Sequence, residues 1–190
     1  ASIQAVTEEI IEGMWKHARA ITGESDNICF AGGVALNCVA NAVMADKDLF
    51  KNIWIMPNPG DAGSSLGCIA ASEKRKLNWQ HPFLGYNIDG EYPVDKLIKE
   101  LETNKMVGVA NGRAEFGPRA LGNRSLLADP RGPEIKDTVN AIKRRQQFRP
   151  FAPAILEEDV HEHFEMPKHA LNSPYMQFTA RVKHPKLFPA

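Results

Sequence analysis

The chain has 190 residues, of which 43% are hydrophobic and 24% are charged, and its formal net charge at pH 7 is zero. This composition is typical of a soluble globular protein with one large or two small domains, and it excludes an intrinsically disordered chain. There is no run of eighteen apolar residues, and the N-terminus lacks the basic start and apolar block of a signal peptide, so we expect a cytoplasmic protein without a membrane span.

The first eighty residues alternate between helical and strand patterns. The small-residue stretch after NPGD predicts a helix, with Asp61 at its N-cap or just before it. In chain order, the predicted elements are a helix over about 3–20, a strand over 28–31 that a glycine pair ends, a helix over about 34–45, a strand in NIWIMP at 52–57 and a helix over 62–78.

The stretch 78–93 is rich in turn-forming residues and has no sustained periodicity, which predicts a connection between two domains. The elements predicted after it are a helix over 94–104, a strand in MVGVAN at 106–111, a helix over 133–145, a short acidic helix over 157–164 and a strand in YMQFTARV at 175–182. Because the first half has few strands and nothing follows the last strand, we expect the chain to be part of a longer protein.

The cysteines and histidines give weak functional signals. Cys29, Cys38 and Cys68 lie in apolar surroundings without CxxC spacing, so we expect buried thiols and neither a disulfide framework nor a zinc site. His161 and His163 are two residues apart, and such residues point to different faces of a helix, so a metal pair is not expected. The remaining histidines are expected to be exposed to solvent, namely His17, His81, His169 and His184.

Basic residues are concentrated in one segment. Residues 113–149 contain nine Lys and Arg against four acidic residues. The overlapping stretch 112–131, GRAEFGPRALGNRSLLADPR, places four arginines among glycines and prolines. Arginines at this density predict either internal ion pairs, for which Glu115 and Asp129 are available, or a pocket for phosphate. Since the arginines outnumber these acids, we favour the pocket. Pro150 and Pro153 are expected to stiffen the turn that carries Arg149.

Two motifs in the first half also suggest ligand contacts. Gly32 and Gly33 lie between a predicted strand and helix, where backbone can approach a phosphate or ribose and Asn37 could reach the same ligand. A plain tight turn explains the two glycines equally well. Asp61 follows the second strand, where its carboxylate could cap the next helix or bind a cation that bridges phosphates, and the two roles can coexist.

Four motifs in this order, ICFAGGVALNCVAN, IWIMPNPGDAGSSLGCI, GRAEFGPRALGNRSLLADPR and FRPFAPAIL, resemble the nodulation-type O-carbamoyltransferase family over nearly the whole chain. The resemblance implies a mixed α/β (α+β) fold. It places the end of a Kae1-like domain, with the actin-like ATPase fold, over 1–80 and a linker over 81–93. A YrdC-like α/β domain, itself truncated, would occupy 94–190.

Enzymes of this family form a carbamoyl adenylate from carbamoyl phosphate and ATP, and they transfer the carbamoyl group to a hydroxyl of a small-molecule acceptor. On this sequence, the resemblance implies the catalytic residues Arg113, Glu115, Arg119 and Arg124. The residues it implies for substrate or nucleotide binding are Gly32, Gly33, Asn37, Asn123, Ser125, Lys143 and Arg149.

Asp61 is the residue that the resemblance implies as a ligand of a divalent metal, Mg or Fe. The family takes further metal ligands from histidines earlier in the Kae1-like domain, and these have no counterpart in this sequence. We therefore expect a partial metal site, and weak binding of phosphate or nucleotide by this chain alone. Neither a membrane nor nucleic acid is an expected partner.

Two other functions are compatible with the residues. One is a nucleotide-binding ATPase or kinase-type module of the actin-like superfamily without carbamoyl chemistry, which would turn over ATP without carbamoyl phosphate. The other is an RNA-binding module that uses the basic segment, and its affinity for RNA would depend steeply on salt concentration.

Overall fold

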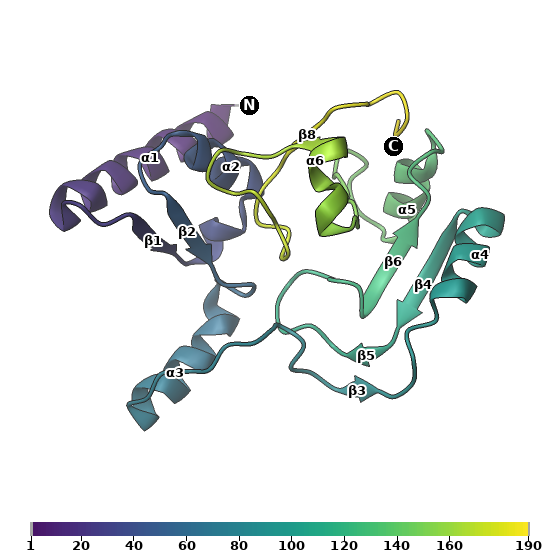
Figure 1. Ribbon diagram of the computed structural model, residues 1–190, viewed down its shortest axis with the longest axis horizontal. Helices are drawn as coiled ribbons and strands as arrows, with labels where there is room; N and C mark the ends of the chain where they lie inside the picture. The colour runs from purple at the N-terminus through teal and green to yellow at the C-terminus, as the bar shows by residue number, and fades with distance from the viewer. Residues whose placement is uncertain (1, 190) are drawn as a thin grey trace. The chain divides into compact units, whose positions relative to one another are not determined.

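The computed structural model describes residues 2–189, a mixed α/β chain with small sheets (Figure 1). The chain divides into two compact units. The first unit contains the residues up to Gln80 together with Glu157–Arg181, and the second contains His81–Leu156 together with the residues from Val182 onward. None of the described helices is long and apolar enough to cross a membrane.

The first unit is built around a parallel pair of strands. Its elements up to Gln80 are α1 (Ser2–Thr22), β1 (Asn27–Phe30), the 3-10 helix η1 (Gly33–Leu36), α2 (Cys38–Asp46), β2 (Asn52–Ile55), the 3-10 helix η2 (Asp61–Gly63) and α3 (Ser64–Glu73). The two strands pair with Asn27 opposite Asn52. Ile11 and Trp15, one helical turn apart on α1, are buried against α2, and the Trp15 ring meets Phe50 edge-on.

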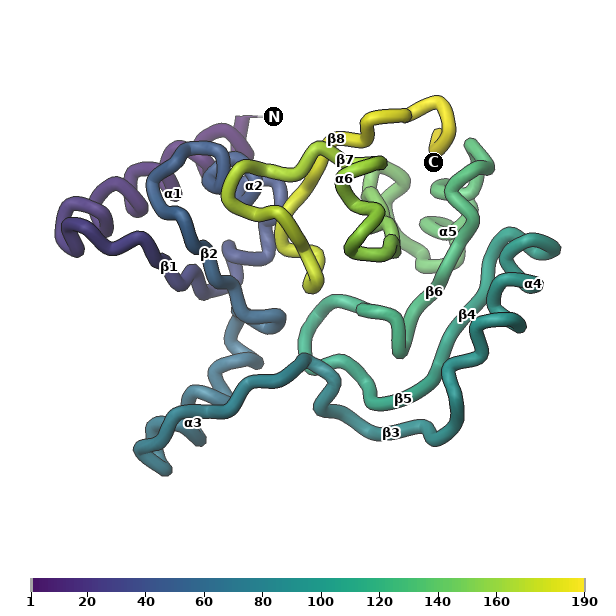
Figure 2. Tube along the Cα trace, in the orientation of Figure 1, coloured from purple at the N-terminus to yellow at the C-terminus, as the bar shows by residue number. Residues whose placement is uncertain are grey.

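Residues 157–181 also belong to the first unit. They contain the 3-10 helix η3 (Glu157–Asp159), α6 (Val160–His163) and β7 (Phe164–Glu165), and β7 pairs with β8 (Arg181–Val182). The buried Asn41 of α2 donates to the carbonyl of Gln177 at 2.9 Å, and Gln177 donates to the carbonyl of Ile55. Figure 2 shows this segment running beside α2 and β2.

The second unit has two antiparallel strand pairs and two helices. Its elements are β3 (Asn87–Ile88), α4 (Val94–Asn104), β4 (Met106–Ala110), β5 (Gly112–Arg113), β6 (Arg124–Ala128) and α5 (Ile135–Ile142). Strand β4 pairs with β6, and β3 pairs with β5. Helix α4 packs on β4 through the buried Leu97, and α5 contacts β6.

The structure confirms the predicted helices α1 and α4, the strands β1, β2 and β4, and the short acidic helix near 157–164. The helix predicted over 133–145 is also present, although it is shorter.

The helix predicted over about 34–45 is wrong in its first turn, because α2 begins only at Cys38 after the η1 turn. The helix predicted over 62–78 ends at Glu73, since Lys74 adopts the left-handed conformation. Most of the strand predicted over 175–182 is irregular, and only β8 remains.

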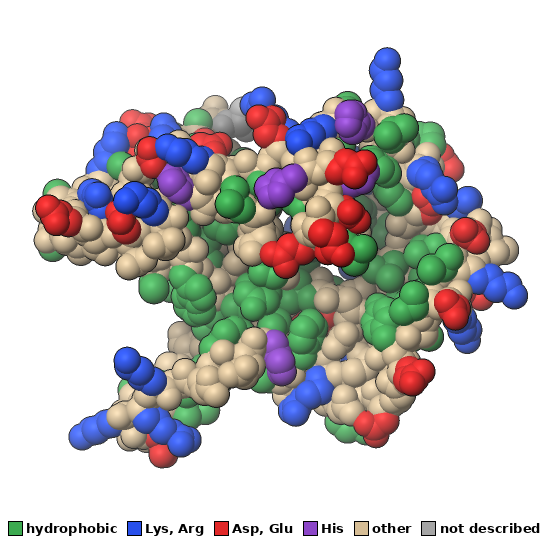
Figure 3. Space-filling model, viewed as in Figure 1, with side chains coloured by type: hydrophobic (Ala, Val, Ile, Leu, Met, Phe, Trp, Pro, Cys, Tyr) green, Lys and Arg blue, Asp and Glu red, His purple; other side chains and the backbone are tan. Residues whose placement is uncertain are grey.

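The prediction of buried thiols is wrong for Cys29 and Cys68, which are exposed, whereas Cys38 is half-buried. Cys29 alternates along β1 with the more buried Ile28 and Phe30, so its side chain lies on the open face of the strand. Cys68 lies on α3, which buries none of its residues. Figure 3 shows Lys and Arg side chains gathered around the end of this helix.

Three of the four histidines expected to be exposed are exposed, namely His17, His81 and His184. The prediction is wrong for His169, whose side chain is 16% exposed. Its Nε2 lies 2.6 Å from an Asp48 carboxylate oxygen, and Lys168 beside it also pairs with Asp48. These contacts connect the 157–181 segment to the turn after α2, which explains the burial of the ring.

Candidate functional site

In the second unit, residues 113–125 run from the last residue of β5 through the connecting loop to the first two residues of β6, and we call this segment the arginine loop. One carboxylate oxygen of Glu115 accepts hydrogen bonds from the backbone N–H groups of Leu121 at 2.8 Å, Asn123 at 2.9 Å and Arg124 at 3.2 Å. The Ser125 hydroxyl accepts from the N–H of Gly122 at 2.9 Å. The far end of the loop is therefore folded back onto Glu115.

Two arginines of this region hold backbone carbonyls. Arg124 donates through Nη1 to the carbonyls of Asn111 and Asn123, at 2.9 and 2.8 Å, and through Nη2 to those of Tyr86 and Gly112, at 3.0 and 3.2 Å. Arg113 donates to the carbonyls of Leu84 and Gly85, at 3.0 and 3.2 Å. The two guanidinium groups thus connect backbone segments that are distant in sequence, which is a positioning role for both residues.

The other arginines differ in their surroundings. Arg131 forms a two-pronged ion pair with the buried Asp129, at 2.8 and 2.7 Å. The Arg131 side chain, with its backbone N–H and Lys105, holds the pKa of Asp129 well below its usual value despite the burial of the carboxylate. Internal ion pairing, one of the two predicted alternatives, therefore accounts for Arg131. Arg119 lies half-buried in the middle of the arginine loop.

The pKa of Glu115 lies below its ordinary value of 4.5. Burial alone would raise it, but the backbone N–H groups of the loop, including those of Leu121, Arg124 and Asn123, stabilise the ionised carboxylate and outweigh burial. Because the folded-state pKa is depressed, this carboxylate contributes stability above its ordinary pKa, and the contribution is lost as the pH falls through the folded value.

We therefore expect the arginine loop to lose protection on acidification. The protection factors for amide exchange at Leu121 and Asn123, measured by NMR as the pH is lowered below the ordinary Glu pKa of 4.5, should fall more than those in β4. Glu115→Gln should remove this pH dependence, because the amide oxygen still accepts hydrogen bonds without titrating. Identical pH profiles for the wild type and Glu115→Gln would contradict the assignment.

Two residues expected to bind nucleotide follow β6 in the chain. Lys143 is the C-cap of α5 and is exposed, as is Arg149 in the turn that follows. Sequence reasoning missed Asn140, which is fully buried and donates to the carbonyls of Gln147 and Arg149, at 3.2 and 3.0 Å. In a sequence, an asparagine near the end of a helix is equally compatible with an exposed position, so the buried role of Asn140 could not be predicted.

In the first unit, the two predicted motifs meet. The carboxyl ends of parallel strands lie at the same edge of a sheet, so the glycine pair after β1 comes beside the NPGD turn after β2. The N–H of Gly32 donates to the carbonyl of Pro59 at 2.8 Å, and a Cβ added to Gly60 would lie 3.9 Å from the Cα of Gly33. Gly32 has φ +94°, which explains the glycine at this position.

Asn37 does not lie one turn into a helix as predicted; it is the N-cap of α2. Its Oδ1 accepts from the N–H of Ala40 at 3.1 Å, and its Nδ2 donates to Gln4 of α1 at 2.9 Å. These contacts use the Asn37 side chain to begin α2 and to attach it to α1.

Asp61 is exposed and begins η2. The N-cap interpretation is wrong, because Gly60 precedes η2 and Gly63 precedes α3, neither with a side-chain cap. Among residues 2–189, no three His, Cys, Asp or Glu side chains are grouped so that they could hold a metal ion. The described residues thus offer Asp61 as a single ligand and do not fit a complete metal site.

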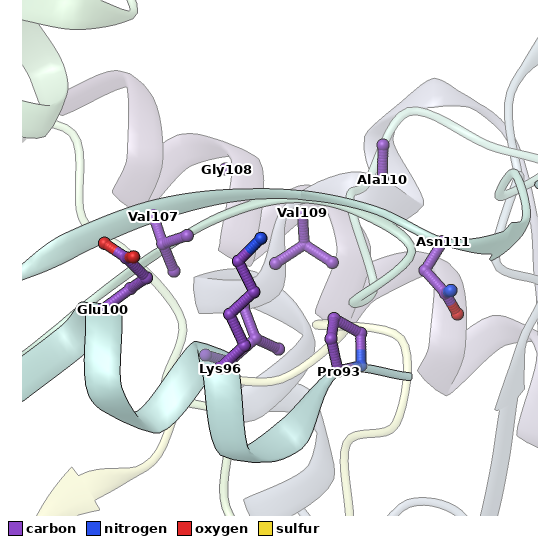
Figure 4. Close-up of a pocket in the computed structure, with 9 residues that line it drawn as sticks. Pro93, Lys96, Glu100, Val107, Gly108, Val109, Ala110 and Asn111 are labelled. Carbon is purple, nitrogen blue, oxygen red and sulfur yellow. The ribbon is translucent and has the colours of Figure 1, made fainter. Parts of the chain in front are cut away.

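A shallow hollow of about 180 Å³ lies between α4 and β4 (Figure 4). Lys96 and Glu100 project from the helix at its rim, and Val107 and Val109 line it from the strand. None of the predicted site residues lines this hollow, although Asn111, whose carbonyl accepts from Arg124, lies at one end of it.

Two family models match successive parts of the chain. One described as carbamoyltransferase N-terminus matches residues 1–71, and one described as carbamoyltransferase C-terminus matches residues 98–187. The first contains the glycine pair and Asp61, and the second contains the arginine loop. Together they match most of the chain.

Nodulation proteins are similar to this chain over most of its length. Nodulation protein NolO of Bradyrhizobium diazoefficiens is 37% identical over 98% of the chain and 39% of its own length. Nodulation protein NolNO of Sinorhizobium fredii is 35% identical over 98% of the chain and 31% of its own length. Nodulation protein U of the same species is 36% identical over 84% of the chain and 30% of its own length.

The chain spans between 30 and 39% of the length of these relatives. The resemblance inferred from the four motifs is confirmed by the two family models and by the relatives. The chain belongs to the carbamoyltransferase family, and it carries sequence of both the N-terminal and the C-terminal part of that family.

Proposed function

We propose that this chain is part of an O-carbamoyltransferase that uses carbamoyl phosphate and ATP to form a carbamoyl adenylate and passes the carbamoyl group to an acceptor hydroxyl. In this proposal, residues 1–80 are the end of a Kae1-like domain and residues 94–190 are most of a YrdC-like domain. The order of the two family matches along the chain supports the assignment.

The proposed chemistry releases both phosphate and pyrophosphate, which requires one water molecule. Water cleaves carbamoyl phosphate to carbamate and phosphate. A carbamate oxygen then attacks the α-phosphorus of ATP, and pyrophosphate leaves. Finally, the acceptor oxygen attacks the carbamoyl carbon, AMP leaves, and the hydroxyl proton is lost. Each step moves negative charge onto phosphoryl oxygens, which fixed cationic groups stabilise.

The arginine loop is the observation that carries the proposal. Glu115 accepts three hydrogen bonds from backbone N–H groups of the loop, and Arg124 donates four to backbone carbonyls. These seven bonds hold the loop in its shape. We assign Arg113, Glu115 and Arg124 to holding the loop, and Arg119 to contact with phosphate. Asn123, Ser125, Lys143 and Arg149 complete the proposed nucleotide and carbamoyl phosphate contacts.

In the first unit, we propose that the backbone at Gly32 and Gly33 approaches the nucleoside, with Asn37 holding the helix that follows. The glycine pair lies close to the turn after β2, and glycines have no side chain that would keep a ligand away from the backbone. This arrangement supports a backbone contact with the nucleoside. Asp61 would be the ligand that this chain contributes to a divalent metal. No step of the reaction is assigned to that metal.

Arg119→Ala should lower carbamoyl phosphate-dependent pyrophosphate release about a hundredfold, because it removes a charge placed against the phosphoryl oxygens. The measurement is pyrophosphate release from ATP, with and without carbamoyl phosphate, by a protein that carries this chain. Arg75→Ala, which removes an exposed charge beyond α3, is the matched control and should have little effect.

Pyrophosphate release that needs no carbamoyl phosphate and is unchanged by Arg119→Ala would contradict the proposal. Turnover of ATP without carbamoyl phosphate would instead favour a nucleotide-binding ATPase or kinase-type module.

A further inference from the structure

Residues 143–151, KRRQQFRPF, form a turn after α5 that we call the basic loop. It contains Lys143, Arg144, Arg145 and Arg149 and no acidic residue. Among the described residues, the side chains of Lys143, Arg144 and Arg149 form no ion pair, and all three are exposed. The charge of this loop is therefore not neutralised within the part of the chain that the structure describes.

A buried side chain fixes the shape of the basic loop. Asn140 of α5 is 0% exposed, and its Nδ2 donates to the carbonyls of both Gln147 and Arg149. Its Oδ1 accepts from Nε of Arg145 at 2.6 Å. In this geometry the buried Asn140 amide uses both its donor group and its acceptor oxygen in hydrogen bonds, which strongly favours this loop conformation. The loop is therefore held in place before any ligand binds.

Arg145 is held against its neighbours in the basic loop. The Arg145 guanidinium lies 4.4 Å from the centre of the Phe151 ring and donates to the carbonyl of Pro150. Burial and the nearby charge of Arg149 lower the pKa of Arg145. Repulsion between these two positive charges is relieved when an anion binds to them.

An aromatic ring lies between these cationic residues in the sequence. Phe148 is 78% exposed, although a large apolar ring at a surface is unfavourable unless something covers it. Cationic side chains that hold phosphates, beside an aromatic face on which a base can stack, are typical of nucleotide-binding surfaces.

We propose that the basic loop binds a nucleoside polyphosphate, with Arg149 on the phosphates, the Phe148 ring against the base, and Asn140 as the residue that positions both. This inference rests on the proposed use of ATP. It adds a residue that contacts the base and a buried residue that holds the loop in its binding shape.

The test compares ATP with inorganic tripolyphosphate, which has the phosphates and no base, by calorimetric titration of the chain. Phe148→Ala should weaken ATP binding about tenfold and leave tripolyphosphate binding unchanged, because it removes only the stacking surface. Phe148→Tyr, which keeps the ring, should bind both as the wild type does. Arg149→Ala should weaken both ligands about tenfold, through loss of a charge-assisted contact.

Lys99→Ala, which removes an exposed positive charge from α4, is the control for net charge and should leave both affinities unchanged. Asn140→Ala should weaken the binding of both ATP and tripolyphosphate, in a protein whose circular dichroism remains that of the folded state. If this variant does not fold, the Phe148 and Arg149 variants still decide the question.

The inference is overturned if neither ligand binds, if Phe148→Ala weakens both ligands equally, or if no loop variant changes ATP affinity. These titrations contain no carbamoyl phosphate. A failure of the loop assignment is therefore distinguishable from a failure of the proposed reaction, which is read from carbamoyl phosphate-dependent pyrophosphate release.

Discussion

Replacing Arg124 with alanine is expected to lower the free energy of unfolding of the second unit by about 3 kcal/mol. The substitution removes four hydrogen bonds from a charged donor to the carbonyls of residues 86, 111, 112 and 123. Each such bond contributes more than a neutral one, and the loss is not additive because the freed carbonyls regain water. Urea unfolding, followed by the amide signals of β4 and β6, measures the change.

The same substitution should reduce carbamoyl phosphate-dependent pyrophosphate release by about a hundredfold or more, because the arginine loop no longer holds its residues in reacting geometry. Arg124→Lys should recover little of either loss, since an ammonium group cannot span four carbonyls as the planar guanidinium does. Arg75→Ala is the matched control for loss of an arginine at an exposed position. A stable Arg124→Ala protein with unaltered amide exchange in the loop would show that these bonds do not hold it.

The parts of the fold that depend on local pattern could be predicted from the sequence. The sequence predicts a helix over 94–104, because apolar side chains recur there at the helical period, and α4 spans those residues. Strand β6 was missed. Its residues RSLLA lie inside an arginine-rich stretch, and the strand forms by antiparallel pairing with β4, from Ala110 opposite Arg124 to Met106 opposite Ala128. Such pairing is not encoded in any local window.

The role of the arginines could be predicted only in part. The density of arginines in the sequence predicts either ion pairs with acidic residues or contact with a phosphate. The pair of Arg131 with Asp129 is an ion pair of the first kind. Arg113 and Arg124 instead use backbone carbonyls as acceptors. Because every residue has a backbone carbonyl, the sequence does not indicate which carbonyls act as acceptors. Only the fold shows which of them surround each guanidinium group.

Gly63→Ala should destabilise the first unit by about 3 kcal/mol or more, because a Cβ there would overpack a site that has no room for it. The added atom would lie 1.8 Å from the carbonyl oxygen of Asn58 and 2.9 Å from its carbonyl carbon. Both are backbone atoms of the buried turn between β2 and η2, so relief requires the turn itself to move. Thermal unfolding followed by tryptophan fluorescence measures the effect, since all three tryptophans of the chain belong to the first unit.

Gly67 supplies the matched control, since it lies four residues further along, inside α3, and a Cβ added to it would meet nothing within 4 Å. Gly67→Ala should therefore stabilise the helix by about 1 kcal/mol through the higher helix propensity of alanine. Opposite signs at the two positions would show that close backbone contact, and not helix propensity, requires glycine at 63. If Gly63→Ala were as stable as Gly67→Ala, the approach of α3 to the turn after β2 would be looser than the structure shows, and the edge proposed for the nucleoside would lose one of its supports.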